Sequence, residues 1–238
     1  MAVKNKPLIP TGSQEAPKKA GLPPIQTGPK EAVVEKKTFG QKPGLFGKRE
    51  GDDTLIMEGD LIMERDMVFD RSIRVKGKIL GKDGKQYNLT VKGTIDAWDD
   101  IDARNITAGQ KIDTRGNLTA TEDITLEGDI DARNMTARHI TANGDITVQL
   151  NITATSMNAG GNITASGGIR AEEDIRAGGN IYAMDIHGRN IDAWSITAGD
   201  IHASGNLVCE ERNKITYNAK TEVAGVFITG RSKQKADV

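Results

Sequence analysis

Two histidines stand at equivalent positions of a short repeat, where their imidazole rings could act together. His187 and His202 each follow a large aliphatic residue by one position, and three repeat units separate them. If three units make one turn of a coil, the two imidazoles stack on the outside of one face, about one strand spacing apart. Such a pair could hold a metal ion or a proton, but a metal site needs further ligands and the sequence offers no clear third. We therefore expect two exposed histidines and no metal site, while His139 stands alone at a corner.

A row of Asp and Asn residues is the second pattern that could form a binding site. One of these residues precedes most of the large aliphatic residues. The row consists of Asp100, Asn105, Asn117, Asp123, Asp129, Asn134, Asp145, Asn151, Asn162, Asp174, Asn180, Asp185, Asn190, Asp200 and Asn206. Stacked carboxylates bind calcium in nonapeptide solenoids, but that motif needs the spacing G-G-x-G-x-D, and Gly178-Gly179-Asn180 stops short of it. Asp and Asn also tolerate a left-handed backbone and hydrogen-bond to nearby main chain. We interpret the row as residues that favour the tight corners of the backbone, and we expect no bound calcium.

The familiar catalytic motifs do not occur in the sequence. It contains no G-x-S-x-G, P-loop, H-E-x-x-H or C-x-x-C pattern. Left-handed hexapeptide enzymes place a small residue two positions before the aliphatic residue, whereas here an Ala follows it by two positions. Lyases built on β-helices use long loops with grouped acids and bases, and this chain has one short insert. The sequence therefore predicts a protein that is not an enzyme and has no catalytic residue, cofactor or small-molecule substrate.

The short segments that carry these residues repeat one sequence pattern: an Asp or Asn, an Ile, a polar residue and an Ala. Large aliphatic markers recur every five or six residues, at Ile95, Ile101, Ile106, Ile112, Leu118, Ile124, Ile130, Met135, Ile140, Ile146, Ile152, Met157, Ile163, Ile169, Ile175, Ile181, Ile186, Ile191, Ile196, Ile201 and Leu207. That step would scatter the isoleucines around a helix of about 3.6 residues per turn. Within each unit, however, inward and outward residues alternate with the period of a strand. The pattern predicts an all-β, three-sided, single-stranded parallel β-helix, which is a solenoid of short strands and tight corners.

The limits of the coil follow from where the phrase begins and ends. Counting from Leu55 to Leu207 gives 27 markers, so we expect about nine coils of three strands over residues 51–209. The first units carry larger inward residues than the Ala of later units, namely Met57, Met63 and Phe69. Because terminal repeats are atypical, we interpret these units as an N-terminal cap. An insert at residues 81–85 has turn chemistry and predicts a loop that bulges from one corner.

The C-terminal part lacks the repeated sequence pattern that marks the corners. Residues 210–230 are rich in β-branched and aromatic side chains and predict a C-terminal β cap of one or two longer strands over the last coil. Residues 231–238 predict a short, basic, loose end. The cap contains the apolar residues Val223, Val226 and Phe227.

The first 50 residues differ in composition from the rest. They hold all seven prolines of the chain. They also hold ten Lys or Arg and four Asp or Glu, a net charge of +6. Residues 51–209 hold sixteen Lys or Arg and twenty-five Asp or Glu, a net charge of −9. This composition predicts a disordered or extended tail. Its apolar islands have the form of docking peptides and contain Leu8, Ile9, Ile25, Leu45 and Phe46. We expect the tail to dock on an acidic protein surface, including the rod of a neighbouring copy, or on an anionic membrane. Nucleic acid is not an expected partner, because the acidic rod would repel phosphate.

Several features bear on the compartment. No segment approaches the ~20 consecutive apolar residues that span a bilayer. The Met-Ala-Val-Lys start lacks the apolar run of a signal peptide. The single Cys209 excludes an internal disulfide and fits a reducing compartment. We therefore expect a cytoplasmic protein, with association to a membrane or incorporation in a virus particle as alternatives.

Four pieces of the repeat carry a family resemblance: GKI at 77–79, GTIDA at 93–97, GDIDA at 128–132 and GNITA at 161–165. They are similar to the G-x-I-x-A phrasing of the bactofilin group, which are polymer-forming cytoskeletal proteins. In that family a proline-rich, charged tail precedes a right-handed, three-sided parallel β-helix. The resemblance therefore implies a right-handed coil and a self-assembling, cytoskeleton-like scaffold. Similar phrases occur in fibre and spike proteins of viral particles, so a virion fibre, spike or decoration protein, anchored by its N-terminal arm, is the alternative.

Self-association is the expected interaction of the rod. An end coil of a solenoid exposes unpaired N–H and C=O groups, which template another strand unless the coil is capped. Both ends of the predicted coil are apolar, with Met57, Met63 and Phe69 at one end and Val223, Val226 and Phe227 at the other. The sequence thus predicts an end-to-end or lateral homo-oligomer.

Overall fold

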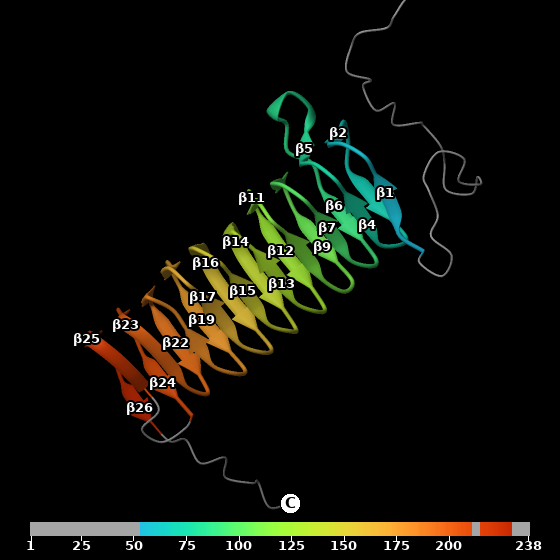
Figure 1. The fold of residues 1–238 in the computed structure, drawn as a ribbon. Helices are drawn as coiled ribbons and strands as arrows, with labels where there is room; N and C mark the ends of the chain where they lie inside the picture. Colours follow the sequence, from blue (N-terminus) through green and yellow to red (C-terminus); the bar gives the residue numbers. More distant parts are fainter. Residues whose placement is uncertain (1–52, 211–214, 230–238) are drawn as a thin grey trace, which may run out of the picture. The chain divides into compact units, whose positions relative to one another are not determined.

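The computed structural model describes residues 53–210 and 215–229, which coil into a parallel β-solenoid of about ten turns (Figure 1). The chain runs along the solenoid once, so its first and last described turns lie at opposite ends of the stack. The prediction of an all-β, three-sided parallel coil is confirmed. The predicted tail at residues 1–50 and the predicted loose end at residues 231–238 lie outside the described residues.

The strands form three faces, in which each strand pairs in parallel with its equivalents on neighbouring turns. Face 1 contains β1 (Leu55–Met57), β4 (Ile73–Val75), β7 (Ile95–Ala97), β10 (Ile112–Thr114), β13 (Ile130–Ala132), β15 (Ile146–Val148), β17 (Ile163–Ala165) and β20 (Ile181–Tyr182). Face 2 contains β2 (Leu61–Met63), β5 (Ile79–Gly81), β8 (Ile101–Ala103), β11 (Asn117–Ala120), β18 (Ile169–Ala171) and β21 (Asp185–Gly188). Face 3 contains β3 (Met67–Phe69), β6 (Leu89–Val91), β9 (Ile106–Ala108), β12 (Asp123–Leu126), β19 (Asp174–Ala177), β22 (Asn190–Ala193), β24 (Leu207–Cys209) and β26 (Phe227–Thr229).

Four longer strands continue around a corner and serve two faces each. β14 (Asn134–Ala142) and β16 (Ile152–Ala159) pass from face 2 to face 3. β23 (Ile196–Ala203) and β25 (Ile215–Val223) pass from face 1 to face 2. β25 and β26 together make a turn beyond Cys209, because β25 pairs with β23 and β26 pairs with β24.

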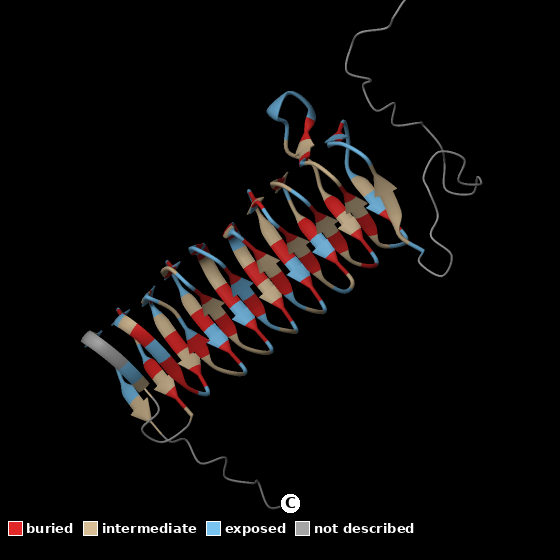
Figure 2. Ribbon diagram, viewed as in Figure 1, coloured by how far each residue is buried: buried red, intermediate tan, exposed pale blue. Residues whose placement is uncertain are grey.

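The core consists of identical or similar side chains stacked in columns. On face 1, Ile112 lies in register between Ile95 of the preceding turn and Ile130 of the next, and all three are fully buried. The residue two positions further on is small and buried as well, and the polar residue between them is less buried. Buried and more exposed residues therefore alternate along the strands (Figure 2). Fully burying one such aliphatic side chain stabilises the fold by roughly 1.5–3 kcal/mol. Cohesion therefore comes from contacts between adjacent turns.

Tight corners bring the backbones of successive turns close together. A Cβ atom added to Gly128 would overlap the carbonyl oxygen of Gln110 on the preceding turn. Among the described residues, only Asp83 (φ 55°) and Gly84 (φ 70°) have a left-handed backbone. Both belong to the short 3-10 helix η1 (Lys82–Gly84) in the insert, which protrudes from the stack after β5 in Figure 1. Most corner glycines are thus required by close approach and not by a left-handed conformation.

Candidate functional site

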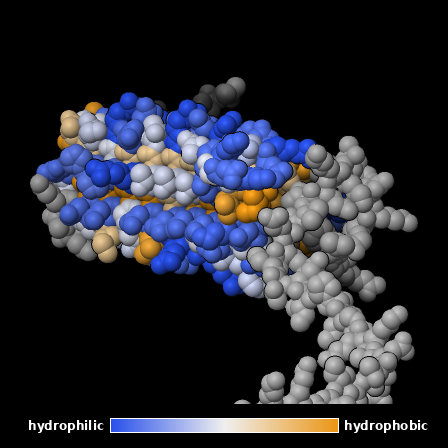
Figure 3. Space-filling model, turned by 90° about the horizontal axis from the view of Figure 1, so that it is seen from above, coloured by the Kyte–Doolittle hydropathy of each residue, from blue (hydrophilic) through white to orange (hydrophobic). Residues whose placement is uncertain are grey.

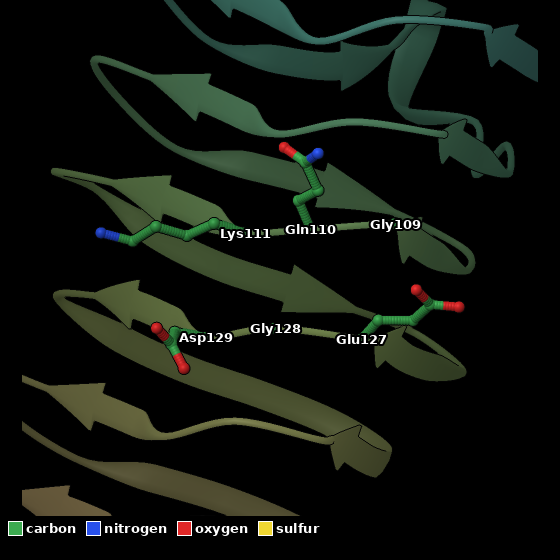
Figure 4. A pocket seen from close by; sticks show the side chains of 6 residues that line it. All are labelled: Gly109, Gln110, Lys111, Glu127, Gly128 and Asp129. Carbon is green, nitrogen blue, oxygen red and sulfur yellow. The ribbon is translucent and has the colours of Figure 1, made fainter.

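A shallow hollow lies at the corner between faces 3 and 1, where β9 leads to β10 and β12 leads to β13 (Figure 4). It is lined by Gly109, Gln110, Lys111, Glu127, Gly128 and Asp129. Lys111 Nζ lies 2.6 Å from Asp131 Oδ2 and 3.1 Å from Asp113 Oδ2, and the hydrogen bond to Asp131 is the main cause that raises the pKa of Lys111. Asp129 Oδ1 accepts the backbone N–H of Asp145 at 2.8 Å. The lining side chains point away from one another in Figure 4, so the hollow lacks the convergent groups of a catalytic site.

The Asp and Asn residues before the aliphatic markers form hydrogen-bonded columns along the corners. Between faces 1 and 2, the N–H of Asn117 donates to Asp100 Oδ1 at 2.8 Å. One turn beyond Asn134, the N–H of Asn151 donates to Asn134 Oδ1 at 3.2 Å, and the N–H of Gly168 donates to Asn151 Oδ1 at 2.9 Å. In these three links a side-chain oxygen accepts the backbone N–H of the equivalent residue on the following turn, whereas Asn117 Oδ1 accepts the side-chain amide of Asn134 at 2.9 Å. The predicted hydrogen bonds to main chain are confirmed.

None of these corner residues uses the left-handed backbone that Asp and Asn tolerate, because Asp83 in the insert is the one non-glycine residue of the described ranges with a positive φ. The carboxylate of Asp100 is also engaged in its column. The N–H of Asn117, followed by Lys78 Nζ at 3.0 Å, lowers the pKa of Asp100. Across residues 53–210 and 215–229, no group of three or more His, Cys, Asp or Glu side chains is placed to hold a metal ion. The columns are therefore a structural device that joins successive turns.

The two stacked histidines lie where the sequence predicts them. His187 on β21 is the register partner of His202 on β23, and their ring centroids are 5.7 Å apart. His139 is elsewhere, on β14, where its Nδ1 lies 2.7 Å from Ser156 Oγ. Cys209 is buried, and its Sγ–H donates to the carbonyl oxygen of Trp194 at 3.2 Å.

An exposed tryptophan at a corner lies between two cations, which the sequence did not indicate. Trp98 follows β7, and Lys76 Nζ and Arg115 Cζ lie 5.5 Å and 5.0 Å from its ring centroid. Lys76 comes from the preceding turn and Arg115 from the following one, as the pairing of β4, β7 and β10 shows. Lys76 also forms an ion pair with Glu58 at 2.9 Å. This cation–π stack joins three successive turns at the corner.

The apolar residues predicted as an interface differ in exposure. Met63 and Phe69 are buried in the first turn, and Met57 is partly buried against the core. At the other end Val223 is partly buried, whereas Val226 and Phe227 are exposed. The other predicted interface residues, Leu8, Ile9, Ile25, Leu45 and Phe46, lie outside the described residues.

The sides of the solenoid carry few large apolar groups. The side shown in Figure 3 is mostly hydrophilic, with hydrophobic atoms in narrow strips and small patches. A second shallow hollow lies on face 1 beside Tyr182 and Met184, both of which are exposed. Hydroxyl groups of Thr164 and Thr197 flank Tyr182 on the adjacent turns. None of the residues that line this hollow is charged.

Comparisons with known proteins give no further guide to the site. No protein-family model matches the chain, and neither a curated protein nor a solved structure matches it. The resemblance to the bactofilin group therefore rests on the repeat phrases alone. Within the described part of the chain, no helix has the length and apolar character to cross a membrane.

Proposed function

We propose that the protein is a rigid, non-catalytic scaffold that associates end to end into a cytoskeleton-like filament or assembly. The observation that carries the proposal is the exposure of Phe227 in the last turn. Phe227 occupies the inward position that Leu207 fills one turn earlier and Ile191 fills two turns earlier. Leu207 and Ile191 are 0% exposed, whereas Phe227 is 52% exposed. A side chain at a core position is thus left uncovered at the end of the stack.

The last turn also offers backbone groups for pairing. β26 pairs with β24 along one edge, and no described strand pairs with its other edge. An unpaired strand edge is a template for another strand. The neighbouring Val226 is 57% exposed and enlarges the apolar surface. A contact of this kind, repeated along one axis, makes a filament where the rotation does not close.

The remainder of the molecule supports a structural role more than a catalytic one. The side chains that line the hollow at the β9–β10 corner do not converge, and no charged residue lines the hollow on face 1. The carboxylates of Asp100 and Asp129 accept backbone hydrogen bonds. The proposal includes the tail as a docking arm, because its +6 balance complements the −9 balance of residues 51–209. An acidic protein surface or an anionic membrane in the cytoplasm is the partner that this charge favours.

Electron microscopy of the purified full-length protein tests the proposal. We expect filaments one solenoid wide, and we expect Phe227→Asp to dissolve them by placing a charge in the end contact. Met184→Asp is the matched control, because Met184 is also exposed but lies on the side of the solenoid at the β20–β21 corner. Discrete particles of uniform length would contradict autonomous polymerisation and favour a virion protein. Filaments that survive Phe227→Asp would place the contact elsewhere.

A further inference from the structure

A column of polar side chains runs along the outside of face 2 in the last four turns. Arg170 on β18, His187 on β21, His202 on β23 and Glu222 on β25 are successive register partners. The two imidazole rings are tilted by 33° with centroids 5.7 Å apart, and both side chains are exposed. Parallel pairing fixes the two backbones at one strand spacing, about 4.8 Å. The histidines are therefore held side by side by the sheet itself.

Glu222 determines which nitrogen of His202 carries a proton. His202 Nδ1 lies 2.9 Å from Glu222 Oε2. Because an ionised carboxylate only accepts hydrogen bonds, Nδ1 is the protonated nitrogen, and in the neutral ring Nε2 keeps its lone pair. A carboxylate behind an imidazole is the usual outer partner of a metal-binding histidine, since it orients the ring and raises the basicity of the other nitrogen. His202 is thus prepared as a ligand through Nε2.

We propose that His187 and His202 chelate one late transition-metal dication, Cu²⁺ in preference to Ni²⁺ or Zn²⁺. Imidazole nitrogen suits these ions, and the order of affinity of such ligands peaks at Cu²⁺. When each nitrogen lies about 2.0–2.1 Å from the metal ion, as for Zn²⁺, the two nitrogens can be at most about 4 Å apart. The ring centroids are 5.7 Å apart, and two ring nitrogens turned toward each other would lie closer together than that. Rotation of the exposed side chains is enough to bring them within that span.

The site has two protein ligands and leaves the other positions of the metal to water. This agrees with the finding that no three His, Cys, Asp or Glu side chains of the described ranges converge on one point. Asp185 and Asp200, register partners two residues before the histidines, add negative charge nearby. Arg170 beside His187 adds positive charge, which opposes a dication, although water screens exposed groups. Metal binding here does not depend on the proposed self-association.

Isothermal titration of the untagged full-length protein with Cu²⁺ at pH 7.4 tests the inference. We expect one Cu²⁺ per chain, with a spectrum in electron paramagnetic resonance that shows two imidazole nitrogens. His187→Ala and His202→Ala should each weaken binding at least tenfold, and Glu222→Gln should weaken it severalfold. Acidification to pH 5 should also release the metal, because protonated imidazole cannot bind it.

His139→Ala is the matched control, since His139 lies on β14 and should leave affinity unchanged. Because the substituted histidines are exposed on a sheet surface, unchanged thermal unfolding of each apo variant shows that the fold is intact. Binding that persists in the His187→Ala/His202→Ala double variant overturns the inference. Equal loss of binding in His139→Ala overturns it as well.

Discussion

Glycine occurs at many corners of this sequence, but the structure requires it for different reasons at different corners. A Cβ atom on Gly128 would overlap a carbonyl oxygen of the preceding turn, whereas a Cβ atom on Gly59 would meet nothing within 4 Å. The sequence predicted which residues face inward, because alternation within a three-residue strand is a local property. It could not distinguish the two glycines, since the atom that excludes a side chain belongs to another turn.

Replacement of Gly128 by Ala should destabilise the fold, because the added methyl group has to push the Gln110 backbone away. Overpacking of this kind costs about 1–3 kcal/mol. Gly59→Ala is the control and should cost nothing, because Ala restricts the unfolded chain without a clash. Thermal unfolding of the two variants provides the comparison. An equal loss of stability in both would show that close approach does not explain the corner glycines.

The strands of this molecule are too short to be stable singly, and the corner columns help to join them. The sequence predicted that Asp and Asn stand at corners and that their side chains bond to main chain. It did not predict the direction of these hydrogen bonds, in which a side chain of one turn accepts the backbone N–H of the next turn. The five- and six-residue steps of the repeat do not reveal which groups of successive turns meet. For the same reason the stacking of Trp98 between Lys76 and Arg115 was missed.

Asp100 makes one such column dependent on pH. The N–H of Asn117 and then Lys78 lower its pKa from the ordinary value of 3.8, so the ionised carboxylate favours the folded state. The stabilisation is present above the unfolded pKa and is lost as the pH falls through the lower folded pKa. Asp100→Asn keeps an oxygen for Asn117 but cannot ionise, so its melting temperature should be below that of the original protein at pH 7 and should approach it below pH 4.

Asp83→Asn is the control for the change of charge. Asp83 lies in the exposed insert with a left-handed backbone that Asn tolerates equally well. Its melting temperature should match that of the original protein at both pH values. A gap between Asp100→Asn and the original protein that stays constant from pH 7 to pH 3 would contradict the role given to the Asp100 carboxylate.

The whole solenoid is a stack in which each strand pairs only with its equivalents on the turns before and after. The sequence predicted this architecture because the repeat is regular over most of the described chain. The state of the ends was harder to predict, since burial there depends on what covers the last turn. Met63 and Phe69 are core residues of the first turn, whereas Phe227, at the core position that Leu207 fills one turn earlier, is exposed.

A stack with nearest-neighbour contacts should fail locally when one turn is damaged. Ile163 on β17 is fully buried between Ile146 and Ile181, and Ile163→Asp would bury an unpaired charge at a cost of several kcal/mol. Amide hydrogen exchange should lose protection in β15, β17 and β20 while the first three turns, residues 55–108, keep it. Thr164→Asp, on the outward side of the same strand, is the control and should leave exchange unchanged. Uniform loss of protection over the described chain would mean that the solenoid unfolds as one cooperative unit.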